Sequence, residues 1–148
     1  MPVLPMQSVH PLIVHFPIAL LLTAAALDAA ALLFKRPGLH RVALWNLALG
    51  TLAAAAAVWS GLRAEDIAKH SFEIHEVMEL HEKLGIATLS AGGLVTLWRL
   101  VRRDALRPWE RACTLALLLA LVGTLAYGAH LGGRLVYEFG VGGRFGIR

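Results

Sequence analysis

The chain has 148 residues, of which 57% are hydrophobic and 16% are charged. A chain of this length has room for one compact domain, 1–148, but not for a separate extramembrane module. Its formal net charge is +4, yet no basic stretch is interleaved with aromatic residues, which argues against nucleic-acid binding. The single cysteine excludes an internal disulfide, and without a Cys-x-x-Cys-His motif a c-type haem has no attachment point.

Four apolar stretches dominate the chain, over residues 11–34, 42–62, 84–101 and 112–131. Each is close to or above the roughly 18–20 residues that a helix needs to cross a bilayer. These stretches are apolar nearly all round, whereas a helix on the surface of a soluble protein keeps a polar face. The sequence therefore predicts an all-α membrane protein, a four-helix up-down-up-down transmembrane bundle that contacts the lipid bilayer.

The first predicted helix, over 11–34, carries a proline inside its first turns. Pro17 removes a backbone hydrogen bond and frees a carbonyl one turn earlier, so we expect the helix to bend beside His10 and His15. A tight turn is predicted at 36–38, where an arginine is followed by proline and glycine. The second helix is expected over the next apolar stretch.

The third predicted helix begins outside the membrane. The sequence reads as helix from Ser71, which is a fair N-cap residue, although the apolar run starts only at Leu84. We therefore expect this helix over 71–101, with its first turns extending beyond the bilayer. The fourth helix is expected over 109–131, and a glycine-rich tail, 132–148, is expected to fold over the outer mouth of the bundle.

Positive charge is concentrated after the first and third helices, where the sequence places Lys35, Arg36, Arg41, Arg99, Arg102, Arg103, Arg107 and Arg111. The segment 62–83, at the opposite end of the predicted bundle, carries six acidic residues. The positive-inside rule places the arginine-rich loops in the cytoplasm and both termini outside it. The opening residues contain no lysine or arginine, so we expect no cleaved signal peptide and a retained first helix.

Six of the seven histidines fall at the predicted extracytoplasmic end: His10, His15, His70, His75, His81 and His130. Only His40 belongs to the other end. A single interfacial histidine is often no more than an amphipathic anchor. Several histidines close together at one end of the bundle favour a functional site, because ionisable residues within or beside membrane spans are uncommon.

Two of these histidines are expected at matching depth. His15 lies one turn inside the first helix, and His81 lies just before the apolar run of the third, which is its diagonal neighbour in a sequentially wound bundle. Facing imidazoles of this kind can serve as the two axial ligands of haem b. Gly61 and Gly85 are expected to leave space for the flat macrocycle.

The remaining outer residues supply further candidates for the haem site. His10, His75 and His130 are alternate ligands or members of a second site. Arg63 and Arg134 lie at the same end and are expected to pair with haem propionates, since guanidinium groups bind carboxylates well.

A divalent transition metal is the alternative cofactor. His75 and Glu79 are spaced i, i+4 and share one helix face, and imidazole favours zinc, copper or nickel. Asp28, an acid inside a predicted span, would continue an ion path inward. Its structural interpretation is a hydrogen bond to Asn46 or Thr51 on the second helix, or snorkelling to the nearby surface.

Two stretches carry a family resemblance: HPLIVHFPIALLL at His10–Leu22 and GAHLGGRLVYEFGVGG at Gly128–Gly143. They resemble a bacterial inner-membrane family known as domain of unknown function 2231. Members are small four-helix membrane proteins, sometimes joined to Rieske or cytochrome c modules, which implies electron transfer. The resemblance gives weight to His10, His15, His81 and the stretch Gly132–Tyr137, while Phe139 stands where a polar residue or histidine is expected.

The leading functional hypothesis is a b-type haem-binding electron-transfer protein or subunit of the bacterial inner membrane. It would pass electrons between a quinol or a redox partner protein and an extracytoplasmic acceptor. The alternative is a protein that binds or transports a divalent transition metal, and a third class is a structural subunit of a larger membrane complex. Self-association is compatible with each. No catalytic triad, phosphate loop or dinucleotide fingerprint is recognisable, so the sequence leaves open whether the protein is an enzyme.

Overall fold

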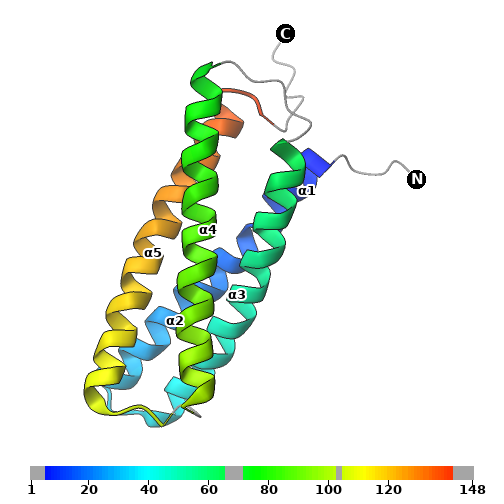
Figure 1. The fold of residues 1–148 in the computed structure, drawn as a ribbon. Coiled ribbons are helices and arrows are strands. Elements are labelled where there is room, and N and C mark those ends of the chain that lie inside the picture. The colour runs from blue at the N-terminus through cyan, green and yellow to red at the C-terminus, as the bar shows by residue number, and fades with distance from the viewer. Residues whose placement is uncertain (1–5, 66–71, 103–104, 142–148) are drawn as a thin grey trace.

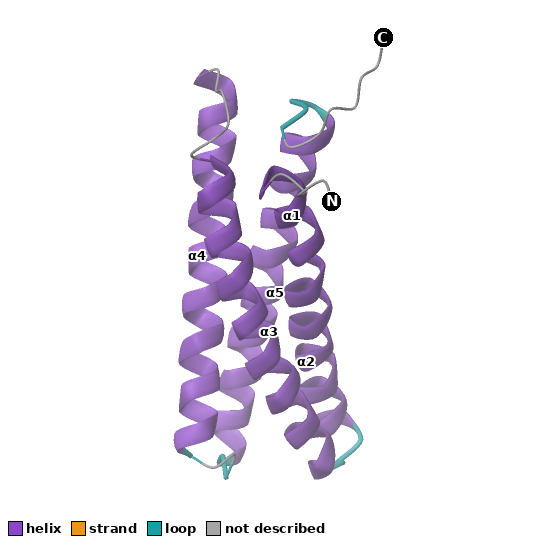
Figure 2. Ribbon diagram, turned by 90° about the vertical axis from the view of Figure 1, so that its right-hand side faces the viewer, coloured by secondary structure: helices purple, strands orange, loops and turns teal. Residues whose placement is uncertain are grey.

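The computed structural model describes residues 6–65, 72–102 and 105–141. Five helices form this part of the chain: α1 Met6–Ile13, α2 His15–Leu33, α3 Pro37–Glu65, α4 Phe72–Val101 and α5 Pro108–Tyr137. No strand occurs among these residues (Figures 1 and 2), so the all-α prediction is confirmed.

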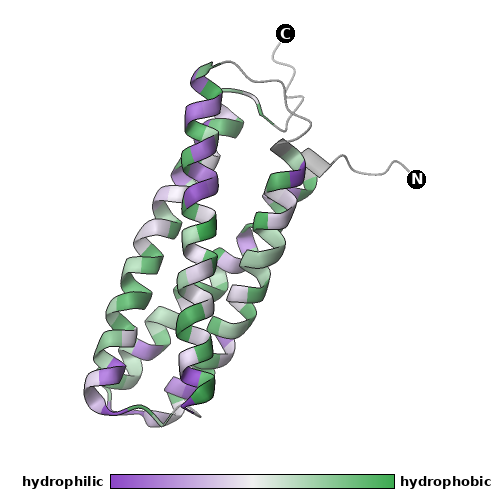
Figure 3. Cartoon of the chain, in the orientation of Figure 1, coloured by the Kyte–Doolittle hydropathy of each residue, from purple (hydrophilic) through white to green (hydrophobic). Residues whose placement is uncertain are grey.

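The helices form four spans that are long and apolar enough to cross a membrane: Val9–Leu33, Pro37–Ala64, Phe72–Val101 and Pro108–Tyr137. Large apolar side chains cover the outside of the bundle; Leu94, for example, is 70% exposed. Figure 3 shows the hydrophobic residues along the helix lengths and the hydrophilic ones gathered toward the ends. The chain is a multi-pass membrane protein, because this outer surface suits lipid and not water.

The spans are arranged as a ring. Helix α3 packs closely on α2 and α4, and α5 packs closely on the same two helices, whereas the backbones of α2 and α4, and those of α3 and α5, do not approach closely within the described residues. The first and third spans are therefore diagonal to each other. Helix α1 packs on α2 and α3 alone, and in Figure 1 the pair α4 and α5 separates from α1 and α3 toward the end that carries the chain termini.

The buried core occupies the middle of the bundle and consists of Leu21, Ala24, Ala25, Leu47, Val95, Leu118 and Leu121. Small residues bring helices close together there. A Cβ on Gly92 of α4 would lie 2.9 Å from the Thr51 hydroxyl of α3. Thr51 also lies within hydrogen-bond distance, 3.3 Å, of the Thr96 hydroxyl, so α3 and α4 are joined by polar as well as van der Waals contact.

The first span is interrupted at Val14, between α1 and α2. Pro17 lacks the N–H that would otherwise pair with the carbonyl of Ile13, which explains why regular helix fails there. The interruption falls at the predicted position, beside the first two histidines. The interruption separates α1 from α2, and α1 packs on α3.

Three predicted boundaries are wrong by five or six residues. The first helical residue is Met6, not residue 11. Helix α3 begins at Pro37, not at residue 42, because proline is well suited to the first helical position and the reversal is completed within 34–36. There Lys35 adopts a positive φ of 52° and the Arg36 N–H donates to the Ala31 carbonyl at 3.0 Å. Helix α5 continues to Tyr137, six residues beyond the predicted end. Glycine is common in membrane helices, and Gly132 does not stop this one.

The start of the glycine-rich tail turns back toward the bundle. Gly140 adopts a φ of +68°, which glycine accepts without steric cost, and the Val141 N–H donates to the Leu135 carbonyl at 2.8 Å. The predicted N-cap Ser71 and the rest of the tail, 142–148, lie outside the described residues.

Candidate functional site

A cavity of about 440 Å³ lies at one end of the bundle and is lined by residues from all five helices. We call this the histidine end, because His10, His15 and His81 are in the cavity wall. The other end, with the turn at 34–36 and residues 105–107, is called the arginine end. A volume of this size is typical of small-molecule and cofactor sites.

The cavity wall is mainly apolar, and its ionisable side chains, which include His10, His15, His81 and Glu82, lie toward the histidine end. Ile18, Ala54 and Leu125 line the inner part. Ile18 follows His10 by eight residues, which corresponds to roughly 12 Å of helix rise. The wall therefore suits an amphipathic ligand whose polar edge faces the histidine end.

The tautomer of His10 is set by its hydrogen bonds. Its Nδ1 lies 3.0 Å from the hydroxyl oxygen of Ser60, which is completely buried. The Ser60 hydroxyl donates its own hydrogen to the Ala57 carbonyl at 2.9 Å, so toward His10 it accepts. The Nδ1 of His10 therefore carries the proton, and Nε2 keeps its lone pair.

His81 on α4 is fixed in the same way. Its Nδ1 lies 2.8 Å from the carbonyl oxygen of Gly128 on α5. A carbonyl can only accept, so Nδ1 donates and Nε2 again keeps its lone pair. A hydrogen bond from one ring nitrogen to a carbonyl, with the other nitrogen left basic, is the usual arrangement of a metal-binding histidine.

The two imidazoles lie together across the cavity. Their ring centroids are 6.2 Å apart and their planes are nearly perpendicular, at 86°. Two glycines let the helix backbones pass directly beside the rings: a Cβ on Gly61 would lie 3.1 Å from His10 Cε1, and one on Gly132 would lie 3.0 Å from His81 Cε1. Larger residues at these positions would displace the imidazoles.

The structure brings His81 together with His10, whereas the sequence favoured His15 as its partner. His15 also lines the cavity, but its side chain is exposed at the outer surface of the bundle. Its Nδ1 donates to the Pro11 carbonyl at 2.7 Å. His70, another outer histidine, lies outside the described residues.

The other outer histidines lie away from the cavity wall. His130 is exposed and stacks on Tyr127, with ring centroids 6.5 Å apart. His75 is exposed on the outer turns of α4, and Glu79, its predicted companion, accepts a hydrogen bond from Lys83 at 2.6 Å. Among the described residues, no group of three or more His, Cys, Asp or Glu is arranged to hold a metal ion.

Neither predicted propionate partner lies in the cavity wall. The guanidinium of Arg63 lies over the Trp59 ring, 5.9 Å from its centroid. Arg134 donates to Glu138 at 2.8 Å and lies over the Phe139 ring. The structure thus gives both arginines protein partners near the histidine end.

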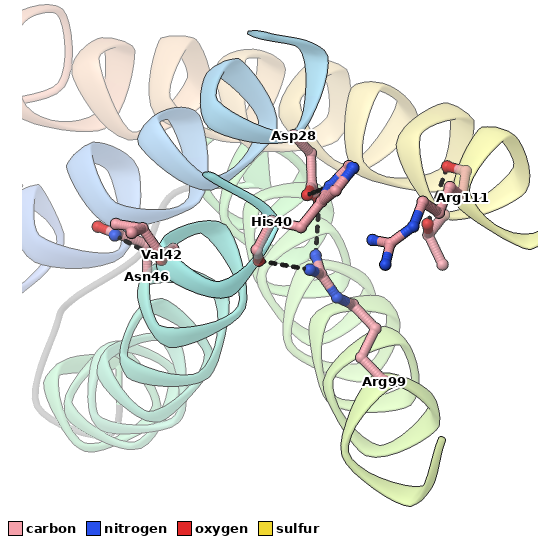
Figure 4. A network of polar contacts seen from close by, with 7 residues as sticks. Asp28, His40, Val42, Asn46, Arg99 and Arg111 are labelled. Carbon is pink, nitrogen blue, oxygen red and sulfur yellow. Dashed lines mark hydrogen bonds and ion pairs between the residues drawn. The ribbon is translucent and has the colours of Figure 1, made fainter. Parts of the chain in front are cut away.

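A second polar group, at the arginine end, is a buried triad of Asp28, His40 and Arg99 (Figure 4). One carboxylate oxygen of Asp28 lies 2.7 Å from His40 Nδ1, and the other accepts from Arg99 at 2.5 Å. Arg99 also donates to the His40 carbonyl at 2.7 Å. Side chains of α2, α3 and α4 are joined in this way, and Asp28 and Arg99 are only 3% and 1% exposed.

Both predicted side-chain partners of Asp28 are wrong. Asn46 donates to the Val42 carbonyl at 2.9 Å, and Thr51 donates to the Leu47 carbonyl at 2.8 Å. Each polar side chain satisfies the backbone of its own helix one turn earlier. Figure 4 shows Asn46 on α3, apart from the contacts of Asp28.

The sequence analysis missed the triad because it counted Arg99 with the loop arginines and gave His40 no role. A signal was present. Asp28 and Arg99 both lie within the last two turns of helices that end at the same side of the bundle. Opposite charges at matching depth in apolar segments favour a buried pair, since an isolated charge there is costly.

A family model described as "Predicted membrane protein (DUF2231)" matches residues 6–144. The chain belongs to this family. No curated protein and no solved structure matches it. The region of the DUF2231 match contains all five helices, so the histidine-lined cavity and the buried triad both lie inside it.

Proposed function

We propose that the protein binds a b-type haem between His10 and His81 and transfers single electrons at the histidine end. The separation of the two rings carries this proposal. An imidazole nitrogen lies about 2.0–2.1 Å from a bound transition metal, so two imidazoles on opposite sides of one ion have centroids roughly 6.3 Å apart. The centroids of His10 and His81 are 6.2 Å apart.

The number of ligands favours haem over a bare divalent ion. Structural and catalytic zinc sites use three or four protein ligands. The described residues provide two facing imidazoles and no larger metal-binding group. Two are sufficient for a haem iron, because the porphyrin supplies the remaining nitrogens.

The polarity of the cavity lining also supports this proposal. A b-type haem has a propionate edge and an apolar edge, and the cavity has ionisable side chains toward the histidine end and a mainly apolar wall that includes Ile18, Ala54 and Leu125. The haem would supply reversible one-electron chemistry at its iron. The protein supplies the axial ligands, their orientation and a surrounding of low polarity that sets the potential.

The charge distribution supports an orientation with the histidine end outside the cytoplasm. The arginine end carries Lys35, Arg36, Arg41, Arg102 and Arg107. Positively charged loops stay on the cytoplasmic side, which in a bacterium makes the inner membrane the location. Electrons would then be delivered to an extracytoplasmic acceptor.

Haem content and elemental composition of the purified full-length protein test the proposal. After expression with ample haem, wild type and His130→Ala should carry stoichiometric haem and iron, while His10→Ala and His81→Ala should each lose them. His130 is the matched control, because it is at the same end but not in the cavity wall. Wild type without a Soret band, or with zinc or copper in place of iron, would reject the haem assignment.

A further inference from the structure

His15 differs from the other two cavity histidines in its exposure. It lies in the cavity wall and is also exposed at the outer surface of the bundle. Its neighbours on that surface are apolar, with Leu12 60% and Phe16 65% exposed. All three belong to the candidate span Val9–Leu33, so a molecule that reaches His15 from outside arrives through lipid.

The hydrogen bond of His15 leaves its Nε2 available as a proton acceptor at the rim of the cavity, the part of the wall that is open to the outer surface of the bundle. Its Nδ1 donates to the Pro11 carbonyl at 2.7 Å, so in the neutral imidazole the lone pair is on Nε2. An imidazole in this state accepts a proton or a hydrogen bond. A ligand that matches the position is therefore lipid-soluble and presents an O–H group.

We propose that His15 is the docking and proton-accepting residue for a bilayer quinol, which reduces the centre held by His10 and His81. This inference rests on the proposed function, because the quinol needs a one-electron acceptor beside it. Among bilayer-soluble hydroxyl compounds, a quinol is the class that yields both electrons and protons.

The oxidation of a quinol releases protons, and His15 is the residue that accepts them. A quinol loses two electrons and two protons to become a quinone. The electrons leave one at a time to the centre, which an extramembrane one-electron redox protein reoxidises after each transfer. With each electron an O–H bond breaks, its proton passes to Nε2 of His15, and this proton is released to water at the histidine end.

Photolabelling of the full-length protein in lipid vesicles tests binding without reference to the centre. An azido-ubiquinol probe, kept reduced by excess reductant, should label peptides of α1, α2 or α5 at the cavity, and excess decylubiquinol should suppress the labelling. His15→Gln should reduce the labelling severalfold, whereas His130→Gln should not. Labelling that excess decylubiquinol does not suppress, or that is equal in His15→Gln, would overturn the proposal.

Reduction kinetics with decylubiquinol test the proton transfer. A positioned base contributes about 10²–10⁴-fold, so His15→Gln should slow reduction of the centre by at least about 100-fold while keeping its full haem content. Loss of haem in His15→Gln would make His15 an axial ligand and reject the proposed role. If wild type carries no haem, the proposed function fails, and the photolabelling alone decides whether the rim binds quinols.

Discussion

Ser60 fixes the orientation of the His10 ring through a hydrogen bond. The Ser60 hydroxyl is completely buried, accepts a hydrogen bond from His10 and donates one to the Ala57 carbonyl. Where a histidine binds a metal, such hydrogen bonds hold the ring orientation and raise the basicity of the other ring nitrogen. In the proposed haem site, Ser60 would therefore orient a ligand without contacting the cofactor.

Ser60→Ala should weaken haem binding without preventing folding, because alanine fills nearly the same volume. Loss of a hydrogen bond that orients a metal ligand typically lowers the metal affinity about 10–100-fold. We expect a loss of haem affinity on the order of 10–100-fold. Haemin titration of the apoprotein measures the effect. Ser90→Ala is the control, since Ser90 is exposed on α4 and should keep wild-type affinity.

Acid should release the haem. Protons compete with the metal for the imidazole nitrogens, so affinity falls as pH falls. Coordination favours the neutral ring, and the centre should therefore persist below about pH 6.5, the reference pKa of histidine, and be lost only on stronger acidification. Spectral titration of wild type and of His130→Ala measures this. The two curves should coincide, and loss of the haem spectrum at or above about pH 6.5 would contradict coordination by histidine.

At the scale of helices, the triad of Asp28, His40 and Arg99 fastens three of them at the arginine end. At the histidine end, the backbone of α1 does not closely approach α4 or α5 within the described residues, and the ring contact between His10 and His81 is made across the cavity. The helices are therefore held together at one end and leave a cavity at the other.

Asp28→Leu should strongly destabilise the protein, because Arg99 would keep a buried charge without its carboxylate. Removing one member of a buried ion pair costs about 3–5 kcal/mol. The double variant Asp28→Leu, Arg99→Met should be less destabilised than Asp28→Leu alone. Denaturant unfolding in detergent measures both, and Glu79→Gln at an exposed pair is the control. A double variant that is less stable than Asp28→Leu would contradict the proposed cost of leaving the Arg99 charge buried without its carboxylate.

Hydropathy predicts the existence of the helices well and their ends less well. Apolar runs revealed the four spans because lipid requires long apolar surfaces. The starts and ends depend on other contacts: Pro37 begins α3, and α5 continues through Gly132 because that glycine lets α5 pass beside His81. Neither effect is visible in an apolar window.

At the scale of the whole molecule, the sequence predicted that the histidines gather at one end but not which two meet. The pairing of His10 with His81 depends on the rotation of each helix about its axis and on the interruption at Val14. A one-residue change in rotation turns a side chain by about 100°, which exceeds what helix periodicity can resolve. The triad of Asp28, His40 and Arg99 was not predicted for a related reason. Arg99 lies inside the bundle, whereas the prediction placed it with the arginines of the loop.

Cysteine labelling should show the arginine end in the cytoplasm. Cys113 is exposed, so the test starts from a Cys113→Ser background. In intact cells an impermeant maleimide should label Phe72→Cys at the histidine end and leave Gly38→Cys at the arginine end unlabelled until the cells are permeabilised. Phe72 and Gly38 are both exposed, so access to the reagent is limited by the membrane alone. Prior labelling of Gly38→Cys would reverse the orientation.

Electron paramagnetic resonance of the oxidised protein tests the central claim most directly. Perpendicular axial imidazoles act equally on two iron d orbitals and leave them nearly degenerate, which gives a low-spin signal of very large anisotropy, whereas parallel rings give an ordinary rhombic signal. The ring planes of His10 and His81 are 86° apart, so we expect the strongly anisotropic signal. A rhombic signal, a high-spin signal or the absence of a haem signal would contradict a haem held between these two histidines.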